Sequence, residues 1–226
     1  MIEKGEFLNE LDCIERRMKF ASSRLKMLRL AYEGKNEVLY SETLRFQTTM
    51  ERTALLARNL PYFVWRKQAR IDVIKNVLEC VPHEIGFTKE GWFSLRLPML
   101  LPKKNSGSVD YIREVTYPIM YNFFKDKDRV RFKDCVIIYR HVYGKEYPSM
   151  RMRDHDNIEV NQVTDIIALY LMPDDNPNVC NHYYMSARGS ENRTEIYVVP
   201  KTDFVLWLNE EKNMEDKGVK LFETQQ

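Results

Sequence analysis

The chain has 226 residues, 44% of them hydrophobic, and its 35 Lys and Arg residues exceed its 33 Asp and Glu residues by two. This composition predicts a folded protein of one domain, or one domain with an appendage, and excludes a disordered tail. The near-neutral balance excludes a uniformly basic surface, so any contact with nucleic acid must come from a local basic patch.

The cysteines and the apolar segments indicate in which cellular compartment the protein is expected. Cys13, Cys80, Cys135 and Cys180 lie far apart and form no C-x-x-C pair, which argues against a zinc ribbon or a disulfide framework and indicates buried, reduced thiols. No stretch approaches the roughly 18 consecutive apolar residues of a membrane span, and residues 1–6 lack a signal-peptide pattern. We therefore expect a cytoplasmic protein with neither a membrane nor a small-molecule cofactor as partner.

The first expected element is a long helix over residues 7–32. Apolar residues there alternate steps of four and three, the spacing of a coiled-coil seam: Phe7, Leu11, Ile14, Met18, Ala21, Leu25, Leu28 and Tyr32. A second apolar edge repeats every seven residues at Cys13, Phe20 and Met27. One partner helix would not cover both edges.

Two further helices are expected in residues 1–82. Gly34 suits a helix C-terminus, and a second helix over 37–59 would complete an antiparallel hairpin. Pro61 suits the first turn of a third helix, which Pro82 ends. We interpret residues 1–82 as a coiled-coil-like region for packing or oligomerisation. Its third helix carries a basic cluster that either contacts phosphate or is a solvated face: Arg66, Lys67 and Arg70.

The sequence pattern of residues 83–209 predicts an α+β domain with a small mixed sheet and helices. Strands at 84–87 and 92–97 flank a Gly-containing turn, and a loop over 98–107 carries Lys103, Lys104 and Asn105. A helix over 109–124 should bend or break at Pro118, and a β-rich run covers 131–143.

The rest of this domain is expected to begin with a helix over 158–172. Strands at 179–187 and 194–199 would form a closing pair, and Thr202 would cap a last helix. Residues 210–226 form a charged tail, which we expect to be frayed.

Two acidic pairs flank the helix expected at 158–172. Asp154 and Asp156 precede it, and Asp174 and Asp175 follow it. If the chain folds back, these carboxylates meet and form a site for Mg²⁺ or Mn²⁺, the usual equipment for phosphodiester cleavage. Each pair also has an ordinary explanation: Asp156 or Asn157 is a good helix cap, and residues 173–176 are good turn residues.

Other polar residues give weaker signals. His155 would point away from its acidic neighbours if the segment is extended, so a ligand role is the minority interpretation. Ser186 and Ser190 show no catalytic base in the sequence, which argues against a nucleophilic hydrolase.

From about residue 91 to residue 200, the order of these parts resembles the RusA-type Holliday-junction resolvases, small Mg²⁺-dependent endonucleases. In that family a strand leads into a loop with Pro, Lys and Asn. A helix, a strand, an Asp-x-Asp-Asn motif that opens a second helix, a further acid and a closing strand pair follow. The matching segments are residues 92–105, 109–124, 131–143, 154–157, 174–175 and the strands up to 199. The resemblance implies that Asp154, Asp156 and Asp175 are catalytic metal ligands, with Asp174 beside them.

One position departs from the RusA pattern. The family usually has a catalytic Lys four residues after the second acid, where this sequence has Val160. Its absence removes a positive charge aimed at the scissile phosphate. Lys103, Lys104 or Lys145 would have to replace it in space.

Two interpretations follow. In the first, the protein is a Mg²⁺-dependent, structure-selective endonuclease on branched DNA and, as the family implies, a homodimer. In the second, it is a catalytically silent relative from a phage or mobile element that binds DNA or protein, with the helical hairpin as its assembly surface. A distant third is a purely structural protein. Basic residues that would contact phosphates are Lys103, Lys104, Arg151, Arg153, Arg188 and Arg193.

Overall fold

A computed structural model describes residues 4–33, 39–64, 66–104, 108–127, 130–149, 152–214, 216 and 219–223. Arg151, Asn105 and the side chains of Arg66, Lys67 and Arg70 lie outside this described part. The chain divides into two compact units, residues 1–76 and 77–226; the boundary predicted from the sequence falls a little later, at residue 82. Among the described residues, no helix is long and apolar enough to cross a membrane.

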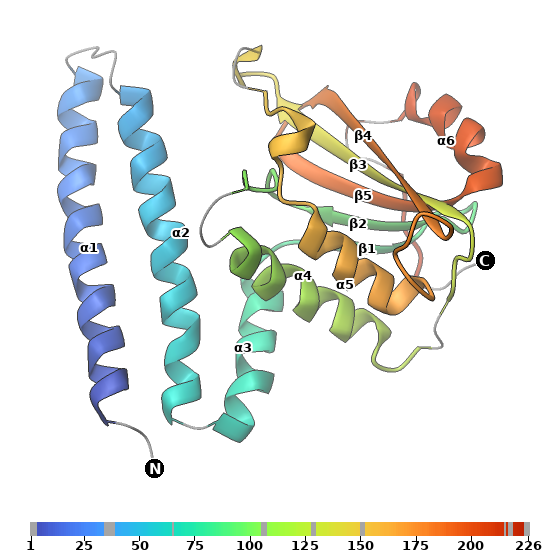
Figure 1. The fold of residues 1–226 in the computed structure, drawn as a ribbon. Coiled ribbons are helices and arrows are strands. Elements are labelled where there is room, and N and C mark those ends of the chain that lie inside the picture. The colour runs from blue at the N-terminus through green and yellow to red at the C-terminus, as the bar shows by residue number, and fades with distance from the viewer. Residues whose placement is uncertain are drawn as a thin grey trace. The chain divides into compact units, whose positions relative to one another are not determined.

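The first unit contains an antiparallel helical hairpin, α1 (Lys4–Glu33) and α2 (Leu39–Val64) (Figure 1). Phe7 near the start of α1 contacts Phe63 near the end of α2, with ring centroids 6.0 Å apart. Arg24 and Glu42 form an ion pair between the helices. These contacts confirm the predicted hairpin, whereas Gly34 and its turn lie outside the described residues.

The predicted coiled-coil seam of α1 divides into two halves in the structure. Phe7, Ile14, Ala21 and Leu28 are shielded from solvent to differing degrees. The alternate positions of the same seam are exposed, namely Leu11, Met18, Leu25 and Tyr32. The hairpin partner therefore covers half of the seam and leaves the other half uncovered.

Pro61 lies inside α2 and does not begin the third helix, so this prediction was wrong. A proline near the end of a helix removes one backbone hydrogen bond, a loss that packing of the last turn offsets. The third helix, α3, runs from Arg66 to Cys80, and Pro82 follows it as expected.

The β-hairpin at the start of the second unit is confirmed. Strands β1 (Glu84–Phe87) and β2 (Phe93–Leu97) pair antiparallel, with Phe87 opposite Phe93. In the turn, the Gly91 amide donates to the Thr88 carbonyl at 3.0 Å. Gly91 has φ of 83°, a conformation that residues with a Cβ rarely adopt.

Three more strands complete a mixed five-stranded sheet in the order β1-β2-β5-β3-β4. They are β3 (Cys135–Gly144), β4 (Cys180–Gly189) and β5 (Arg193–Pro200). Strand β3 is parallel to β4 and antiparallel to β5. The sheet confirms the α+β class and the mixed strand directions.

The prediction that the last two strands pair with each other was wrong, because β3 lies between them. Their short connection crosses the end of β3, where the Gly144 amide donates to Asn192 Oδ1 at 2.9 Å. An ideal Cβ on Gly144 would lie 3.5 Å from the Ser190 carbonyl oxygen. This is an ordinary van der Waals distance, so the connection passes over the end of β3 without requiring a glycine there.

Helices lie on both faces of this sheet (Figure 1). Helices α4 (Ser108–Phe124) and α5 (Asn161–Leu171) pack with the larger apolar cluster on one face. Helix α6 (Phe204–Glu211) contributes Trp207 to a smaller cluster on the other face. Helix α4 continues through Pro118, so the alternative of a break there was wrong.

The C-terminal segment is docked where it is described, contrary to the expected fraying. Phe222 and Phe87 exchange two backbone hydrogen bonds of 2.7 Å each. An ideal Cβ on Gly86 would lie 2.5 Å from the Phe222 carbonyl oxygen, so this glycine permits the close approach. The N-cap of α6 is Asp203 and not Thr202, because a 3₁₀ turn over Lys201–Asp203 precedes the helix.

Candidate functional site

The first acidic pair lies at the N-terminal end of α5, next to the lysine loop. Asp154 precedes a 3₁₀ turn, η2 (His155–Asn157), and both Asp154 and Asp156 are exposed. Lys103 pairs with Ile158 through a backbone bridge, and the Lys104 amide donates to the Asn157 carbonyl at 3.0 Å. The structure therefore brings the segment with Asp154 and Asp156 beside the segment with Lys103 and Lys104.

The second acidic pair lies beyond the other end of α5. The helix has 11 residues, and at a rise of 1.5 Å per residue it is about 16 Å long. Among the described residues, no group of three His, Cys, Asp or Glu side chains could hold a metal ion. The structure does not bring Asp174 and Asp175 to Asp154 and Asp156.

The ordinary explanations hold for only one pair. The N-cap residue of α5 is Val160, so neither Asp156 nor Asn157 caps this helix. Asp174 does organise a turn, because its Oδ1 accepts the Asp175 amide at 2.9 Å and its Oδ2 accepts the Asn176 side-chain amide. These hydrogen bonds lower the pKa of Asp174 below its usual value.

Val160 occupies a core position. Its side chain belongs to the cluster between α5 and the sheet and is 5% exposed. The Val160 carbonyl accepts hydrogen bonds from the Thr164 amide at 2.9 Å and from the Tyr139 hydroxyl at 3.4 Å. The position that aligns with the resolvase lysine therefore points into the core.

Three of the predicted phosphate-binding arginines hold the protein's own backbone or acids. The Arg153 guanidinium donates to the Leu101 carbonyl. Arg188 donates to the Tyr147 carbonyl and to Ser149 Oγ, both at 2.6 Å. Arg193 Nε donates to Glu195 Oε1 at 2.7 Å.

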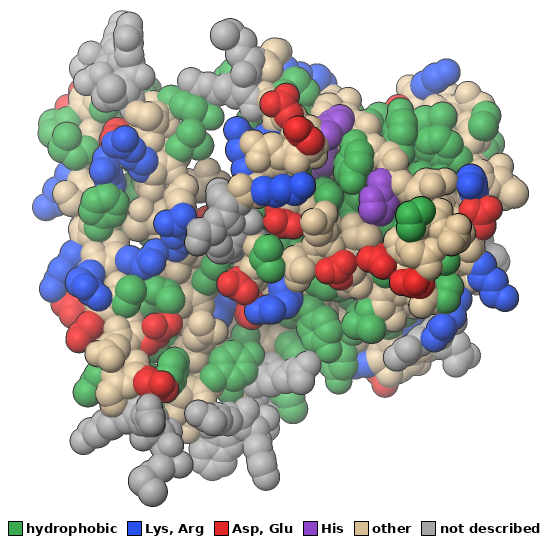
Figure 2. All heavy atoms as spheres, viewed as in Figure 1, with side chains coloured by type: hydrophobic (Ala, Val, Ile, Leu, Met, Phe, Trp, Pro, Cys, Tyr) green, Lys and Arg blue, Asp and Glu red, His purple; other side chains and the backbone are tan. Residues whose placement is uncertain are grey.

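The structure reveals a base beside Ser186, which the sequence did not. His155 Nε2 lies 3.1 Å from Ser186 Oγ, although 31 residues separate them. Figure 2 shows histidine side chains among hydrophobic ones at this surface, with acidic side chains close by. The contact joins η2 to the edge strand β4, and nothing in the local sequence marks it.

His155 belongs to a series of ring contacts that runs into the core. Its ring lies 6.0 Å from that of His141 and 5.9 Å from that of Tyr184. Tyr184 in turn stacks on Tyr139 at 5.5 Å. Burial, followed by the charges of His155 and Arg153, lowers the pKa of His141 to about 4. His141 is therefore neutral at physiological pH and acts as an uncharged core residue.

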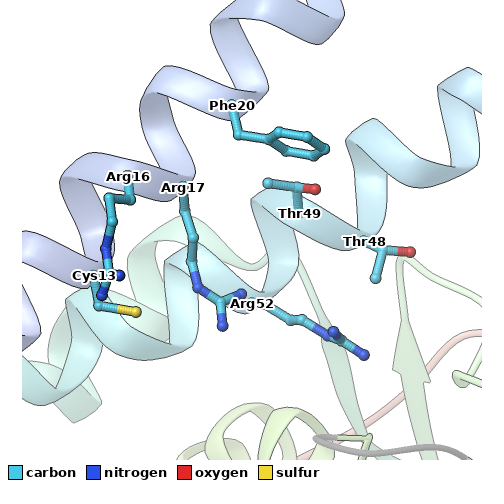
Figure 3. A pocket seen from close by; sticks show the side chains of 7 residues that line it. All are labelled: Cys13, Arg16, Arg17, Phe20, Thr48, Thr49 and Arg52. Atoms are coloured by element: carbon cyan, nitrogen blue, oxygen red, sulfur yellow. The ribbon is translucent and has the colours of Figure 1, made fainter.

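A different kind of site lies on the helical hairpin. An open groove of about 430 Å³ between α1 and α2 is lined by Cys13, Arg16, Arg17, Phe20, Thr48, Thr49 and Arg52. Figure 3 shows the first four side chains extending from α1 and the last three from α2. We call this feature the arginine groove.

The charges of the arginine groove are not neutralised within it. Arg16 Nε donates to the Asp12 carbonyl at 3.3 Å. Arg17 and Arg52 form no ion pair with any residue in the described ranges. The Arg24 guanidinium lies 4.8 Å from the centroid of Phe20 at the edge of the groove, but its charge is paired with Glu42. A positive, partly aromatic surface of this kind suits an anionic ligand.

The sequence held a signal for this groove. Arg17 and Arg24 are seven residues apart, as are Arg45 and Arg52, so each pair lies on one side of its helix. The second apolar edge, with Cys13 and Phe20, runs between the arginines of α1. Each pattern alone is typical of a solvated face, and only the antiparallel pairing places the two together.

These features define an α+β protein with a helical hairpin, a basic groove on that hairpin and a mixed sheet. The chain belongs to a family of unknown function, DUF6100, whose sequence profile matches residues 3–225. No curated protein matches the chain.

Two solved structures resemble part of the chain. One is the periplasmic domain of Helicobacter pylori MotB (residues 90–256), with 16% identity, coverage of 55% of this chain and 83% of that chain, and a TM-score of 0.29. The other is a periplasmic domain of MotB (residues 64–256), with 17% identity, coverage of 55% and 71%, and a TM-score of 0.29. Likeness at this level carries no argument about function.

Proposed function

We propose that this protein binds nucleic acid without cutting it, and that the arginine groove holds the phosphate backbone. The composition of the groove carries the proposal. Arginines from both helices meet there, and none of its described lining residues is acidic. A local basic site also agrees with a chain whose net charge is only +2.

Guanidinium groups suit phosphate because their planar N–H donors match two phosphate oxygens at once. Phe20 is 48% exposed and offers a ring on which an unpaired base could stack. The Thr48 hydroxyl lies in the same lining and provides a further donor. The Thr49 hydroxyl donates to the Arg45 carbonyl at 2.8 Å and keeps only its acceptor capacity. The groove thus combines charge for the backbone with an aromatic surface for a base.

The sheet domain supports the non-cutting part of the proposal. Its two acidic pairs lie at opposite ends of α5, and Val160 is buried where the resolvases carry a lysine. A lysine in that core position would lose its hydration and would not reach a surface phosphate. We therefore prefer the silent RusA-like interpretation to the nuclease.

The test is fluorescence anisotropy with labelled duplex DNA and a four-way junction over a range of salt concentrations. Arg17→Gln/Arg52→Gln should weaken binding by about tenfold or more and reduce the log–log salt slope by about two. Lys75→Gln/Lys125→Gln removes two exposed charges outside the groove and should leave binding nearly unchanged.

Two results would overturn the binding proposal. Equal losses in the groove and control variants would show that only general charge matters. Wild-type protein that binds neither DNA at about 50 mM salt would exclude the function directly.

A Mg²⁺-dependent endonuclease for branched DNA remains a second candidate. It is favoured by one observation: Asp154 and Asp156 stay exposed next to the segment with Lys103 and Lys104. Calorimetry with Mg²⁺ and Mn²⁺, with and without junction DNA, tests it. Metal binding and cutting that are both lost in Asp156→Asn, but kept in the exposed control Asp126→Asn, would establish the nuclease and refute the silent interpretation.

A further inference from the structure

We propose that α1 packs in antiparallel orientation against α1 of a second copy of this chain. The contact would use the uncovered half of the predicted seam, Leu11, Met18, Leu25 and Tyr32, which we call the exposed stripe. It lies on a different edge of α1 from the arginine groove, so the inference does not depend on nucleic-acid binding.

The exposed stripe has the geometry of a helix interface. Its residues recur every seven positions, which places them along one edge of the helix. Their exposed fractions are 37%, 57%, 46% and 73% in chain order. An exposed apolar row of this length along one helix edge is typical of an interaction site.

The charges of α1 indicate which partner fits. Residues 4–15 carry four acidic side chains and one Lys, whereas residues 16–33 carry six basic side chains and one Glu. The helix therefore changes from a net charge of −3 in its first half to +5 in its second. A partner helix must carry the opposite order of charges along the contact.

A second copy of α1 in antiparallel orientation provides this complement. Each acidic half then lies along the basic half of the other copy, and the same surface is used on both chains, as in a two-fold symmetric dimer. A parallel pair would place like charges together along the full contact, which is unfavourable. The charge order thus selects both the partner and its direction.

Glu15 and Arg29 can be used to test whether the two α1 helices are antiparallel. They are two heptads apart on the same side of the exposed stripe, one in each half of α1. Glu15 forms an exposed pair with Lys19 at 2.5 Å within the helix, and Arg29 is exposed. In the antiparallel pair, Glu15 of one copy lies near Lys26 and Arg29 of the other.

Sedimentation equilibrium on the full chain tests the interface. We expect a species of twice the 27.1 kDa monomer mass. Met18→Glu/Leu25→Glu should weaken the dimer by about 100-fold or more, since two charges per chain enter an apolar contact. Leu30→Glu is the matched control, because Leu30 is 64% exposed on α1 but off the stripe, and it should leave the dimer intact.

Charge reversal tests the direction. Glu15→Arg and Arg29→Glu should each weaken the dimer by about three- to tenfold, and the double variant should recover it. Glu15, Met18, Leu25 and Arg29 are all exposed, so circular dichroism should show unchanged helix content in each variant. A wild-type monomer at about 100 μM, or a dimer insensitive to Met18→Glu/Leu25→Glu, would overturn the proposal. Single reversals without effect would overturn the antiparallel direction.

Discussion

Arg140 on β3 and Glu195 on β5 are directly opposite each other in the sheet, and Arg140 Nη1 donates to Glu195 Oε2 at 3.1 Å. Both are buried under α6. Further donors to Glu195 are Arg193 Nε at 2.7 Å and the Tyr197 hydroxyl at 3.0 Å. Glu211 accepts from Arg140 Nε at 2.9 Å. Both oxygens of Glu195, and Nε and Nη1 of Arg140, are therefore hydrogen-bonded within the fold.

Removing the charge of Glu195 should strongly destabilise the protein. Glu195→Gln leaves Arg140 buried without its main counter-charge, and we expect the free energy of unfolding to fall by about 3 to 5 kcal/mol. Urea denaturation followed by circular dichroism measures this change. The exposed pair Lys201–Asp134, 3.6 Å apart, offers a control, since Asp134→Asn should change stability by less than about 1 kcal/mol. Comparable losses in both variants would contradict the assignment.

His141 should make the protein sensitive to mild acid. Its pKa is about 4 when folded against 6.5 for the free group, so the unfolded state binds more protons between these pH values. Stability is therefore fully present above about pH 6.5 and falls by about 3 kcal/mol as the pH drops through this window.

The variant His141→Leu removes this group while it keeps an apolar side chain in the core. Its free energy of unfolding should depend less on pH between about 6.5 and 4 than that of the wild type. His83→Leu serves as the comparison, because His83 is only half-buried. Parallel curves for wild type and His141→Leu would refute the role of His141.

A lysine at Val160, where the RusA pattern has one, should damage the fold and should not create activity. Val160→Lys places an ammonium group in the core, where the loss of hydration should destabilise by about 3 kcal/mol or more. The matched substitution Val205→Lys, at a site that is 68% exposed on α6, should be nearly neutral. A stable Val160→Lys protein that cuts branched DNA with Mg²⁺ would support the nuclease.

Arg188 should act as a clamp on the segment after β3 and not as a phosphate ligand. Without its hydrogen bonds to Tyr147 and Ser149, the amides of residues 145–149 should exchange with solvent faster. Arg188→Ala should accelerate this exchange and leave DNA affinity within about twofold, as judged by anisotropy. A large loss of affinity without faster exchange would restore the phosphate-binding prediction.

Local signals in the sequence predict those elements that local contacts determine. The β1–β2 hairpin could be predicted, because the glycine at position 91 and the apolar residues on both sides both indicate a turn between strands. The structure has Gly91 at a positive φ, as such a turn allows. The spacing of apolar residues in α1 predicted the helix and its two apolar edges. It could not show which half of the seam α2 covers, since that depends on the angle between the two helices.

The contacts between segments that are distant in the chain could not be predicted from the sequence, because they depend on how the elements are arranged in space. The short link between β4 and β5 has the length of a hairpin turn, and only the position of β3 shows that it spans a neighbour. The acidic pairs were expected to meet, but the length of α5 separates them unless the chain turns back. The contact of His155 with Ser186 depends on the parallel pairing of β3 and β4, which no local pattern encodes.

The backbone pairing of Phe222 with Phe87 has a consequence for aggregation. An unpaired outer strand is a template for strands of other molecules, and natural proteins cover or blunt such edges. Here the protein's own C-terminal segment occupies the outer edge of β1 at Phe87. A nascent or proteolysed chain that lacks this segment would expose an apolar hairpin edge. The segment around Phe222 thus covers this part of the sheet edge against intermolecular strand addition.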